Sequence, residues 1–369
     1  MNVNDLIAHI RDANIASTVL MVRGAPGIGK SAAILQASAQ RAEDLGLKAG
    51  VIEYGDQPAE GFGMKDGFGF IDVRLSQCDP VDIGGLPVAS VHGTQDRLVP
   101  DWFPFIGRED VPDYGILALE EIVSAPMSVQ AAAYQLTHDR RIGSKRMKPG
   151  WSIVMTGNRM TDGGVVFKMP TPLANRATHI DVESDLDCWR SWGLSQGNIE
   201  TCLLAFMAMR PDLLNTFDDH VTKKLEGDAF ATERSWVMVD RYEKAKLPAD
   251  RMYNLAMGSV GKGPAAEYIA FRDVWLQMPS IEAILLNPHS APLPDDSATQ
   301  YAVAVALGAR TTHENQESVF NYLERFAKAG RPEMAVLSIQ DSLRRDSTLS
   351  QTSTFNKWAI SNASLISGV

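Results

Sequence analysis

The sequence contains only three cysteines among 369 residues: Cys78, Cys188 and Cys202. Their number is odd and their spacing is wide, so the chain offers neither a disulfide framework nor the paired spacing of a zinc site. We interpret them as buried or incidental thiols of a protein that works in a reducing compartment.

Long apolar runs are missing as well. No segment approaches the eighteen or so apolar residues that a membrane-spanning helix needs. The N-terminal segment MNVNDLIAHIRDANIAS carries charges among its apolar positions, which is typical of an amphipathic helix and not of a signal peptide. We therefore expect a soluble, cytoplasmic protein that has no membrane segment.

Positive charge is also scarce, since 35 lysines and arginines face 45 aspartates and glutamates, for a net charge of −10. This balance argues against a nucleic-acid-binding surface over the whole molecule, but it leaves room for a local basic strip. The hydrophobic content of 45% and charged content of 22% are those of a globular protein, and the length suffices for two or three compact units.

Short apolar segments alternate with helical patterns through the first half of the chain. The expected strands are, in chain order, residues 18–22, 69–75, 115–119, 151–156 and 178–182. The segments GILAL and WSIVMT are almost entirely apolar, as in strands that are buried on both faces of a parallel sheet. The pattern predicts a three-layer α/β/α sandwich whose ligand lies at the carboxyl ends of the strands.

Strand patterns end near residue 184, and helical patterns follow. The segment LNPHSAPLPDDSA, rich in Pro, Asp and Ser, predicts a linker. Beyond it we expect two more helices and a Ser/Thr-rich tail. The predicted domains are an α/β nucleotide-binding domain at residues 1–184, an all-helical lid domain at 185–285, and a linker with a C-terminal helical extension at 286–369.

The segment GAPGIGKSA follows the first expected strand and matches G-x-x-x-x-G-K-[ST] at every fixed position. Its glycines allow backbone N–H groups to converge on one point, and the helix that follows adds free N–H groups and partial positive charge. Lys30 supplies a charge for the β- and γ-phosphates, and the Ser31 hydroxyl suits Mg²⁺. Although a flexible glycine turn is the alternative, we predict a nucleotide phosphate-binding loop formed by Gly24, Ala25, Pro26, Gly27, Ile28, Gly29, Lys30, Ser31 and Ala32.

Two carboxylates, Glu120 and Glu121, follow the buried segment GILAL. Carboxylates at the end of a buried strand are costly unless a cation lies in front of them, and a metal–nucleotide complex supplies one. We predict that Glu120 holds Mg²⁺ together with Ser31, and that Glu121 orients the attacking water. The alternative is a solvated turn after the strand.

Two further polar residues follow the later strands. Asn158 ends the segment IVMTGN and is predicted to place the same water or to contact the γ-phosphate, although an asparagine chosen for a turn is the alternative. Arg176 precedes the last expected strand. An arginine supplied in trans stabilises the charge that develops during phosphoryl transfer, whereas the same residue taken alone would be read as a surface arginine.

These motifs, in the order GAPGIGKS, LALEE, TGNR and PLANR, resemble those of the AAA+ ATPases. The segments SQCDPVDIGGLP, DWFP, SVQAAAYQL, HDRRIGSKRMKPGW and TERSW resemble the MoxR-like branch of that family. The resemblance covers about residues 1–275. It implies a Mg²⁺-dependent ATPase whose phosphate loop lies in the middle of the sheet and is followed by a helical lid.

The resemblance also assigns roles to two arginines. Arg234 in TERSW matches the lid arginine that reaches the γ-phosphate, and Arg176 matches the arginine finger that enters the site of a neighbouring subunit. A finger of this kind implies a ring, usually of six subunits. One departure is Glu120, where the family usually has aspartate; the extra methylene would shift Mg²⁺ by about an ångström and slow hydrolysis without preventing binding.

Two segments leave their function open. Five basic residues occur within nine positions, and they either contact nucleic acid or an acidic partner or form a solvated hairpin tip: Arg140, Arg141, Lys145, Arg146 and Lys148. Trp102, Phe103 and Phe105 either grip a substrate in a central pore or pack their own segment onto the domain.

Two functions are compatible with these observations. In the first, an ATP-driven ring remodels or activates a protein partner in a chaperone-like manner, and the resemblance suggests a partner with a von Willebrand factor A-like domain. In the second, the ring is a nucleic-acid-linked motor of the restriction or helicase-loader type. The acidic charge balance and the MoxR-like segments favour the first.

Overall fold

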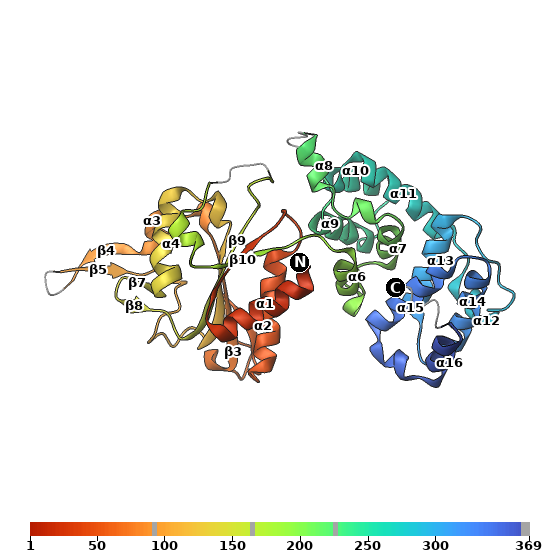
Figure 1. Cartoon of the computed structure of the whole chain (residues 1–369), viewed down its shortest axis with the longest axis horizontal. Coiled ribbons are helices and arrows are strands. Elements are labelled where there is room, and N and C mark those ends of the chain that lie inside the picture. The colour runs from red at the N-terminus through yellow and green to blue at the C-terminus, as the bar shows by residue number, and fades with distance from the viewer. Residues whose placement is uncertain (91–93, 163–166, 224–227, 363–369) are drawn as a thin grey trace. The chain divides into compact units, whose positions relative to one another are not determined.

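In the computed structural model, which describes residues 1–90, 94–162, 167–223 and 228–362, the chain divides into two units, Met1–Ser184 and Asp185–Val369 (Figure 1). Each unit has buried apolar clusters of its own. Among the helices in these residues, none is long and apolar enough to cross a membrane.

A six-stranded sheet, parallel throughout, forms the centre of the first unit. Its strands, in spatial order, are β10 (Thr178–Asp181), β1 (Val19–Arg23), β9 (Gly150–Gly157), β6 (Tyr114–Glu120), β3 (Gly67–Arg74) and β2 (Gly50–Glu53). The five expected strands are confirmed. The phosphate-loop strand β1 lies inside the sheet, between β9 and the edge strand β10, and so closer to one edge than the expected middle position. The short edge strand β2 was missed, because only Val51 and Ile52 in it are apolar.

Helices cover both faces of this sheet (Figure 1), which confirms the predicted α/β/α sandwich. Helices α1 (Val3–Ala16) and α2 (Lys30–Asp44) pack against each other and against β6 and β9. On the other face, α3 (Pro80–Gly84) contacts α4 (Met127–Asp139), and the apolar side of α4 joins the core cluster of the sheet. A short helix, α5 (Thr171–Ala174), precedes β10.

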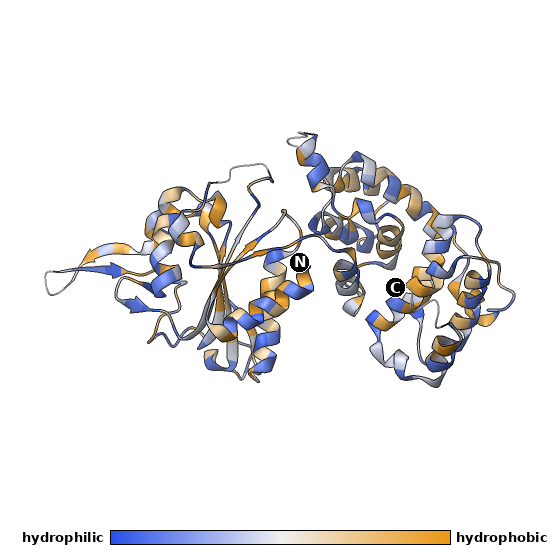
Figure 2. Ribbon diagram, viewed as in Figure 1, coloured by the Kyte–Doolittle hydropathy of each residue, from blue (hydrophilic) through white to orange (hydrophobic). Residues whose placement is uncertain are grey.

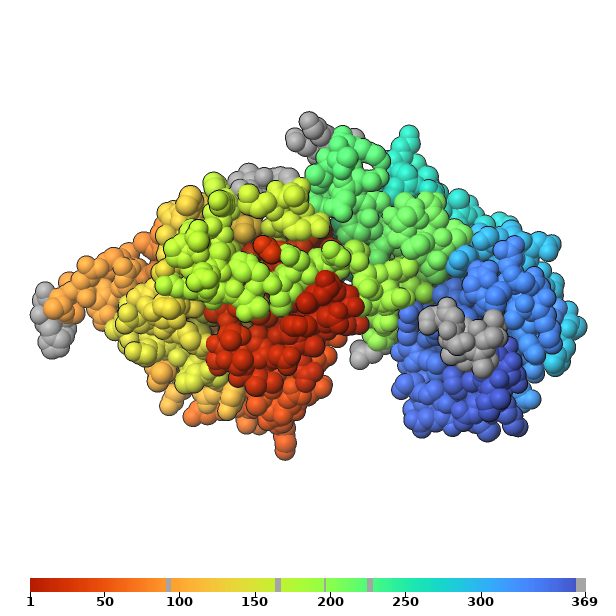
Figure 3. Space-filling model, viewed as in Figure 1, coloured from red at the N-terminus to blue at the C-terminus, as the bar shows by residue number. Residues whose placement is uncertain are grey.

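Two antiparallel hairpins extend from this sandwich: β4 (Leu86–Ala89) with β5 (Gln95–Leu98), and β7 (Arg141–Ile142) with β8 (Lys145–Arg146). The first hairpin stands out from the surface of its unit (Figure 3), and both of its strands are largely exposed. Its first strand is the more apolar of the two (Figure 2), with Leu86 and Val88 exposed.

The second unit is all-helical in the part that the structure describes. Its α-helices are α6 (Leu186–Leu194), α7 (Thr201–Met209), α8 (Phe217–Thr222), α9 (Glu233–Lys244), α10 (Ala249–Val260), α11 (Lys262–Gln277), α12 (Ile281–Leu286), α13 (Ser297–Arg310), α14 (Gln316–Lys328), α15 (Pro332–Arg345) and α16 (Ser353–Ser361). The chain also forms short 3₁₀ helices: η1 (Met64–Asp66), η2 (Leu75–Gln77), η3 (Ile122–Ser124), η4 (Ser195–Gly197), η5 (Pro211–Leu213) and η6 (Ser347–Gln351).

The expectation of two helices beyond residue 298 was wrong, because α14, α15 and α16 follow α13 and the last of these lies in the Ser/Thr-rich tail. The tail is helical because its polar residues cap a helix: the Thr352 side chain accepts a hydrogen bond from the Phe355 N–H at 3.0 Å. Trp358 then packs on Phe320, with ring centroids 5.4 Å apart.

Helix α13 lies beyond the predicted linker, yet it packs against α7 and α11, which come before it. Val305 of α13 belongs to the same core cluster as Phe206 of α7 and Phe271 of α11. The three-domain division at residues 184 and 285 stays a prediction. Residues 363–369, the end of the predicted extension, lie outside the described residues.

A buried ion pair joins α6 to α15. Arg190 and Asp341 lie 2.5 Å apart, and their side chains are only 4% and 0% exposed. Arg344 contacts both Asp341, at 3.4 Å, and Asp187, at 2.6 Å. Burial raises the pKa of Asp341 above its ordinary value, and the two guanidinium groups oppose that shift. The carboxylate therefore depends on both arginines to remain charged.

Replacing Arg190 by methionine is expected to destabilise the second unit by about 3 kcal/mol, because Asp341 keeps its burial and loses its closest cation. Thermal unfolding of the full chain, followed by calorimetry, measures this loss. The control is Lys328→Met, which removes an exposed lysine from a pair with Glu324 and should cost less than about 1 kcal/mol. Equal unfolding midpoints for the two variants would contradict the expectation.

Candidate functional site

The segment between β1 and α2 forms a tight loop at the carboxyl end of β1. Gly29, the N-cap of α2, has a φ of +97°, a left-handed conformation that favours glycine. Gly24 is required for a different reason, since a Cβ there would lie 2.5 Å from Ile28 Cδ1 and 2.7 Å from the Val182 carbonyl oxygen. The loop therefore has the backbone shape that brings the first N–H groups of α2 toward a bound anion.

Lys30 lies inside this loop. Its ammonium group donates hydrogen bonds to the carbonyl oxygens of Gly24, at 2.7 Å, and Ala25, at 2.9 Å. It also donates to the Asn158 side-chain oxygen, at 3.3 Å, although 128 residues separate the two in the sequence. The structure thus brings together Lys30 and Asn158, two residues predicted to contact the γ-phosphate, at the carboxyl ends of the neighbouring strands β1 and β9.

Glu120 is the last residue of β6 and is only 7% exposed. One of its carboxylate oxygens, Oε2, accepts a hydrogen bond from the Thr156 hydroxyl. The other, Oε1, is buried and has no hydrogen-bond partner within the described structure. A buried carboxylate oxygen without a partner is costly, and a cation bound there would remove that cost.

Glu121 is exposed, and its backbone is left-handed, with a φ of +57°. Such a conformation is unusual for a residue with a side chain and recurs at functional sites. Its carboxylate oxygen Oε2 accepts a hydrogen bond from the Ser76 hydroxyl at 2.6 Å. Sequence reasoning missed Ser76, because nothing in its local pattern shows that residues 76 and 121 meet.

Acidic side chains gather at the carboxyl ends of β3 and β6. The pKa of Asp72 is raised by burial and by the nearby carboxylates of Glu120 and Glu121, and Arg74 offsets the shift only in part. Among the described residues, no three His, Cys, Asp or Glu side chains are placed to enclose a metal ion. A divalent cation beside Glu120 would accordingly take its remaining ligands from Ser31, water and nucleotide phosphates, as Mg²⁺ does.

The two predicted arginines lie in different units. The guanidinium carbon of Arg176 lies 3.8 Å from the ring centroid of Tyr134 on α4, so the side chain is held by a cation–π contact. Arg234 is exposed in the first turn of α9, which begins with a capping box between Thr232 and Ser235. The role of Arg234 at the nucleotide stays a prediction.

The basic hairpin offers fewer free cations than its sequence suggested. The Lys148 side chain is 8% exposed, and its ammonium group donates to the Val111 carbonyl oxygen and to Asp113. Arg140 donates to the carbonyl oxygens of Ser17 and Trp151. These two residues therefore fix the hairpin to its own domain.

The aromatic residues of the segment 98–107 also contact their own domain. Phe103 is fully buried, and its ring lies 6.2 Å from that of Trp102 and 6.3 Å from that of Phe105. All three belong to the core of the first unit or pack directly against it. Packing accounts for these residues without a role as pore-lining groups.

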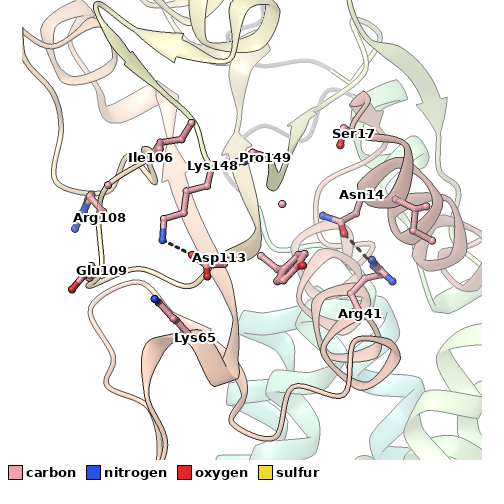
Figure 4. Close-up of a pocket in the computed structure, with 14 residues that line it drawn as sticks. Asn14, Ser17, Arg41, Lys65, Ile106, Arg108, Glu109, Asp113, Lys148 and Pro149 are labelled. Carbon is pink, nitrogen blue, oxygen red and sulfur yellow. Dashed lines mark hydrogen bonds and ion pairs between the residues drawn. The ribbon is translucent and has the colours of Figure 1, made fainter.

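Figure 4 shows a pocket of about 690 Å³ at the opposite edge of the sheet, where β6 and β9 begin. Three of its cations are already engaged: Lys148 with Asp113, Arg41 with Asn14, and Arg108 with Asp110. The fourth cation of the lining is Lys65, so most of the positive charge around this pocket is already paired with protein groups.

Comparison with known proteins found no matching family model and no matching curated protein. Among solved structures, NtrX from Brucella abortus is 14% identical over 98% of this chain and 67% of that chain, with a TM-score of 0.32. A putative ATPase from Cytophaga hutchinsonii is 11% identical over 90% and 88%, with a TM-score of 0.33. Drosophila ORC bound to DNA is 11% identical over 98% and 78%, with a TM-score of 0.29.

Replacing Lys30 by alanine is expected to abolish ATP binding, because it removes the cation that lies inside the loop. Isothermal titration calorimetry with MgATP measures the loss. The control is Lys48→Ala, since Lys48 is exposed and lies beyond the far end of α2. Unchanged ATP binding by the Lys30 variant would overturn the assignment of residues 24–32 as a phosphate loop.

Proposed function

We propose that this protein is an ATP-binding and ATP-hydrolysing enzyme of the AAA+ type, which works as a ring, usually of six subunits. The observation that carries the proposal is the meeting of Lys30, inside a glycine-shaped loop, with Asn158 at the end of the neighbouring strand. A cation inside a phosphate loop and a neutral amide beside it are the groups that bind a γ-phosphate and position a water.

Each residue of the site has a task in this reaction. The loop N–H groups and Lys30 bind the phosphates, while Ser31 and the partnerless oxygen of Glu120 would hold Mg²⁺. The metal ion, when bound, neutralises charge that develops on the transferred phosphoryl group. Glu121 orients the attacking water, with Asn158 beside it.

Arg176 is assigned to the nucleotide of a neighbouring subunit. Its guanidinium group rests on Tyr134, and its Nη1 atom is buried without a hydrogen-bond partner in the described structure. A guanidinium group matches the geometry of a phosphate, so Arg176 suits the nucleotide of an adjoining subunit once its side chain turns away from Tyr134 and uncovers this donor. Arg234 would reach the γ-phosphate from the helical lid.

For the work that the ring performs, we propose remodelling or activation of a protein partner in the manner of MoxR-like ATPases, with a von Willebrand factor A-like domain as the partner class. The inward placement of Arg140 and Lys148 supports this choice over a nucleic-acid-linked motor, because it reduces the basic hairpin to three residues near the surface. ATPase activity that rises with single- or double-stranded DNA at physiological salt would favour the motor instead.

The ring is tested by mixing two inactive variants. Arg176→Ala should bind ATP nearly as well as the wild type yet hydrolyse it poorly, because the finger serves a neighbour's site. Glu121→Gln should also bind ATP, while its turnover falls by orders of magnitude because water is no longer positioned. Phosphate release measured over a range of mixing ratios should show partial recovery, since some interfaces pair an intact Glu121 with an intact Arg176.

A protein that works as a monomer cannot recover in this way, because each chain carries its own defect. Size-exclusion chromatography of the mixture with ATP provides the control that the two variants assemble together. Co-assembly without any recovered activity would contradict the role of Arg176 as a finger that acts in trans.

A further inference from the structure

The side chain of Thr156 contacts both carboxylate residues of the site. It lies on β9, two residues before Asn158, and is 1% exposed. Its hydroxyl donates a hydrogen bond to Glu120 Oε2 and accepts one from the backbone N–H of Glu121 at 3.3 Å. A hydroxyl has one proton to donate and lone pairs with which to accept, so it makes both bonds at the same time.

The two hydrogen bonds hold different parts of Glu120 and Glu121: one holds a side chain and the other holds a backbone N–H group. The bond to Glu120 fixes a side chain that has one more rotatable bond than aspartate, and it leaves Oε1 as the buried oxygen without a partner. The bond to Glu121 holds the N–H group of a residue whose backbone is left-handed. That conformation is unfavourable by itself, so a hydrogen bond that favours it helps to keep the Glu121 side chain in place.

The fixed orientation matters because Glu120 has two equivalent oxygens. If both were free, either could bind a cation in several rotamers, and each would be desolvated without compensation. Since the Thr156 hydroxyl satisfies one oxygen, a single oxygen in a single rotamer remains for Mg²⁺. The only hydroxyl that touches both carboxylate residues, among the described side chains, is that of Thr156.

We propose that Thr156 is a positioning residue of the Mg²⁺ site, which fixes the oxygen that Glu120 offers to the metal and supports the backbone of Glu121. This inference rests on the proposed function, since it assumes that the protein binds MgATP. It assigns Thr156 no contact with the nucleotide itself, so the metal-free affinity for ATP should not depend on it.

The test compares Thr156→Val, which keeps the shape of the side chain and removes the hydroxyl, with the control Thr156→Ser, which keeps the hydroxyl. ATP binding is measured by calorimetry, first in EDTA and then over a Mg²⁺ titration. The valine variant should bind ATP like the wild type in EDTA, yet require about tenfold more Mg²⁺ for its full affinity, as expected from loss of a hydrogen bond to a charged group. The serine variant should match the wild type in both conditions.

A second measurement shows whether Thr156 acts through Glu120. In a Glu120→Gln background, Thr156→Val should no longer change the Mg²⁺ requirement, because the metal-binding carboxylate is already lost. If the valine variant unfolds below the assay temperature, Thr156→Ala replaces it in the same comparison.

Two results separate the failure of this inference from that of the proposed function. Equal Mg²⁺ requirements for the wild type and the valine variant, in a protein that binds ATP, would overturn the role of Thr156 alone. Absence of MgATP binding by the wild-type protein would overturn the proposed function and this inference with it.

Discussion

Parallel pairing of β9 with both β1 and β6 is the constraint on which the site depends. Because the three strands run in the same direction and lie side by side, their carboxyl ends meet at one edge. The phosphate loop follows β1, Glu120 is the last residue of β6 and Glu121 the next residue, and Asn158 follows β9. A change in the register of β9 by one residue would turn Thr156 to the other face of the sheet and separate it from Glu120.

Neutral hydroxyl and amide groups contact the charged residues at the carboxyl ends of these strands. Thr156 contacts Glu120 and Glu121, Ser76 contacts Glu121, and Asn158 contacts Lys30. Each of these neutral groups adds hydrogen bonds without changing the charge balance, so the carboxylates remain available to a cation and the ammonium remains available to an anion. The ammonium of Lys30 and the carboxylates of Glu120 and Glu121 are thus each held by neutral groups at the carboxyl ends of neighbouring strands.

In the second unit, buried polar side chains connect helices to one another. The Arg190–Asp341 pair ties α6 to α15, and Tyr268 donates to Glu243 at 2.8 Å from inside an aromatic cluster. The first contact spans 151 residues and crosses the predicted boundary at residue 285, whereas the second spans 25 residues, from α11 to α9. Helices on either side of that boundary therefore share a core, with Val305 of α13 in the same cluster as Phe206 of α7.

The sequence by itself determined the elements whose signal is local. The alternation of short apolar segments with helical patterns predicted the sheet, and the spacing of Gly24, Gly29, Lys30 and Ser31 predicted the loop, because backbone conformation and burial are encoded over a few residues. Much of the candidate site was predicted in the same way, since Glu120 ends an apolar strand and Glu121 and Asn158 each follow one directly.

Tertiary structure alone decided which polar side chains meet. Ser76 lies 45 residues from Glu121, and Thr156 lies 36 residues from Glu120, so neither contact has a sequence pattern. The same holds for Lys148, whose charge left open a ligand-binding hairpin or a solvated hairpin tip, whereas in the structure its ammonium group donates to Asp113. A hydrogen bond depends on distances of a few ångströms between chain segments, and only the packed sheet fixes those distances.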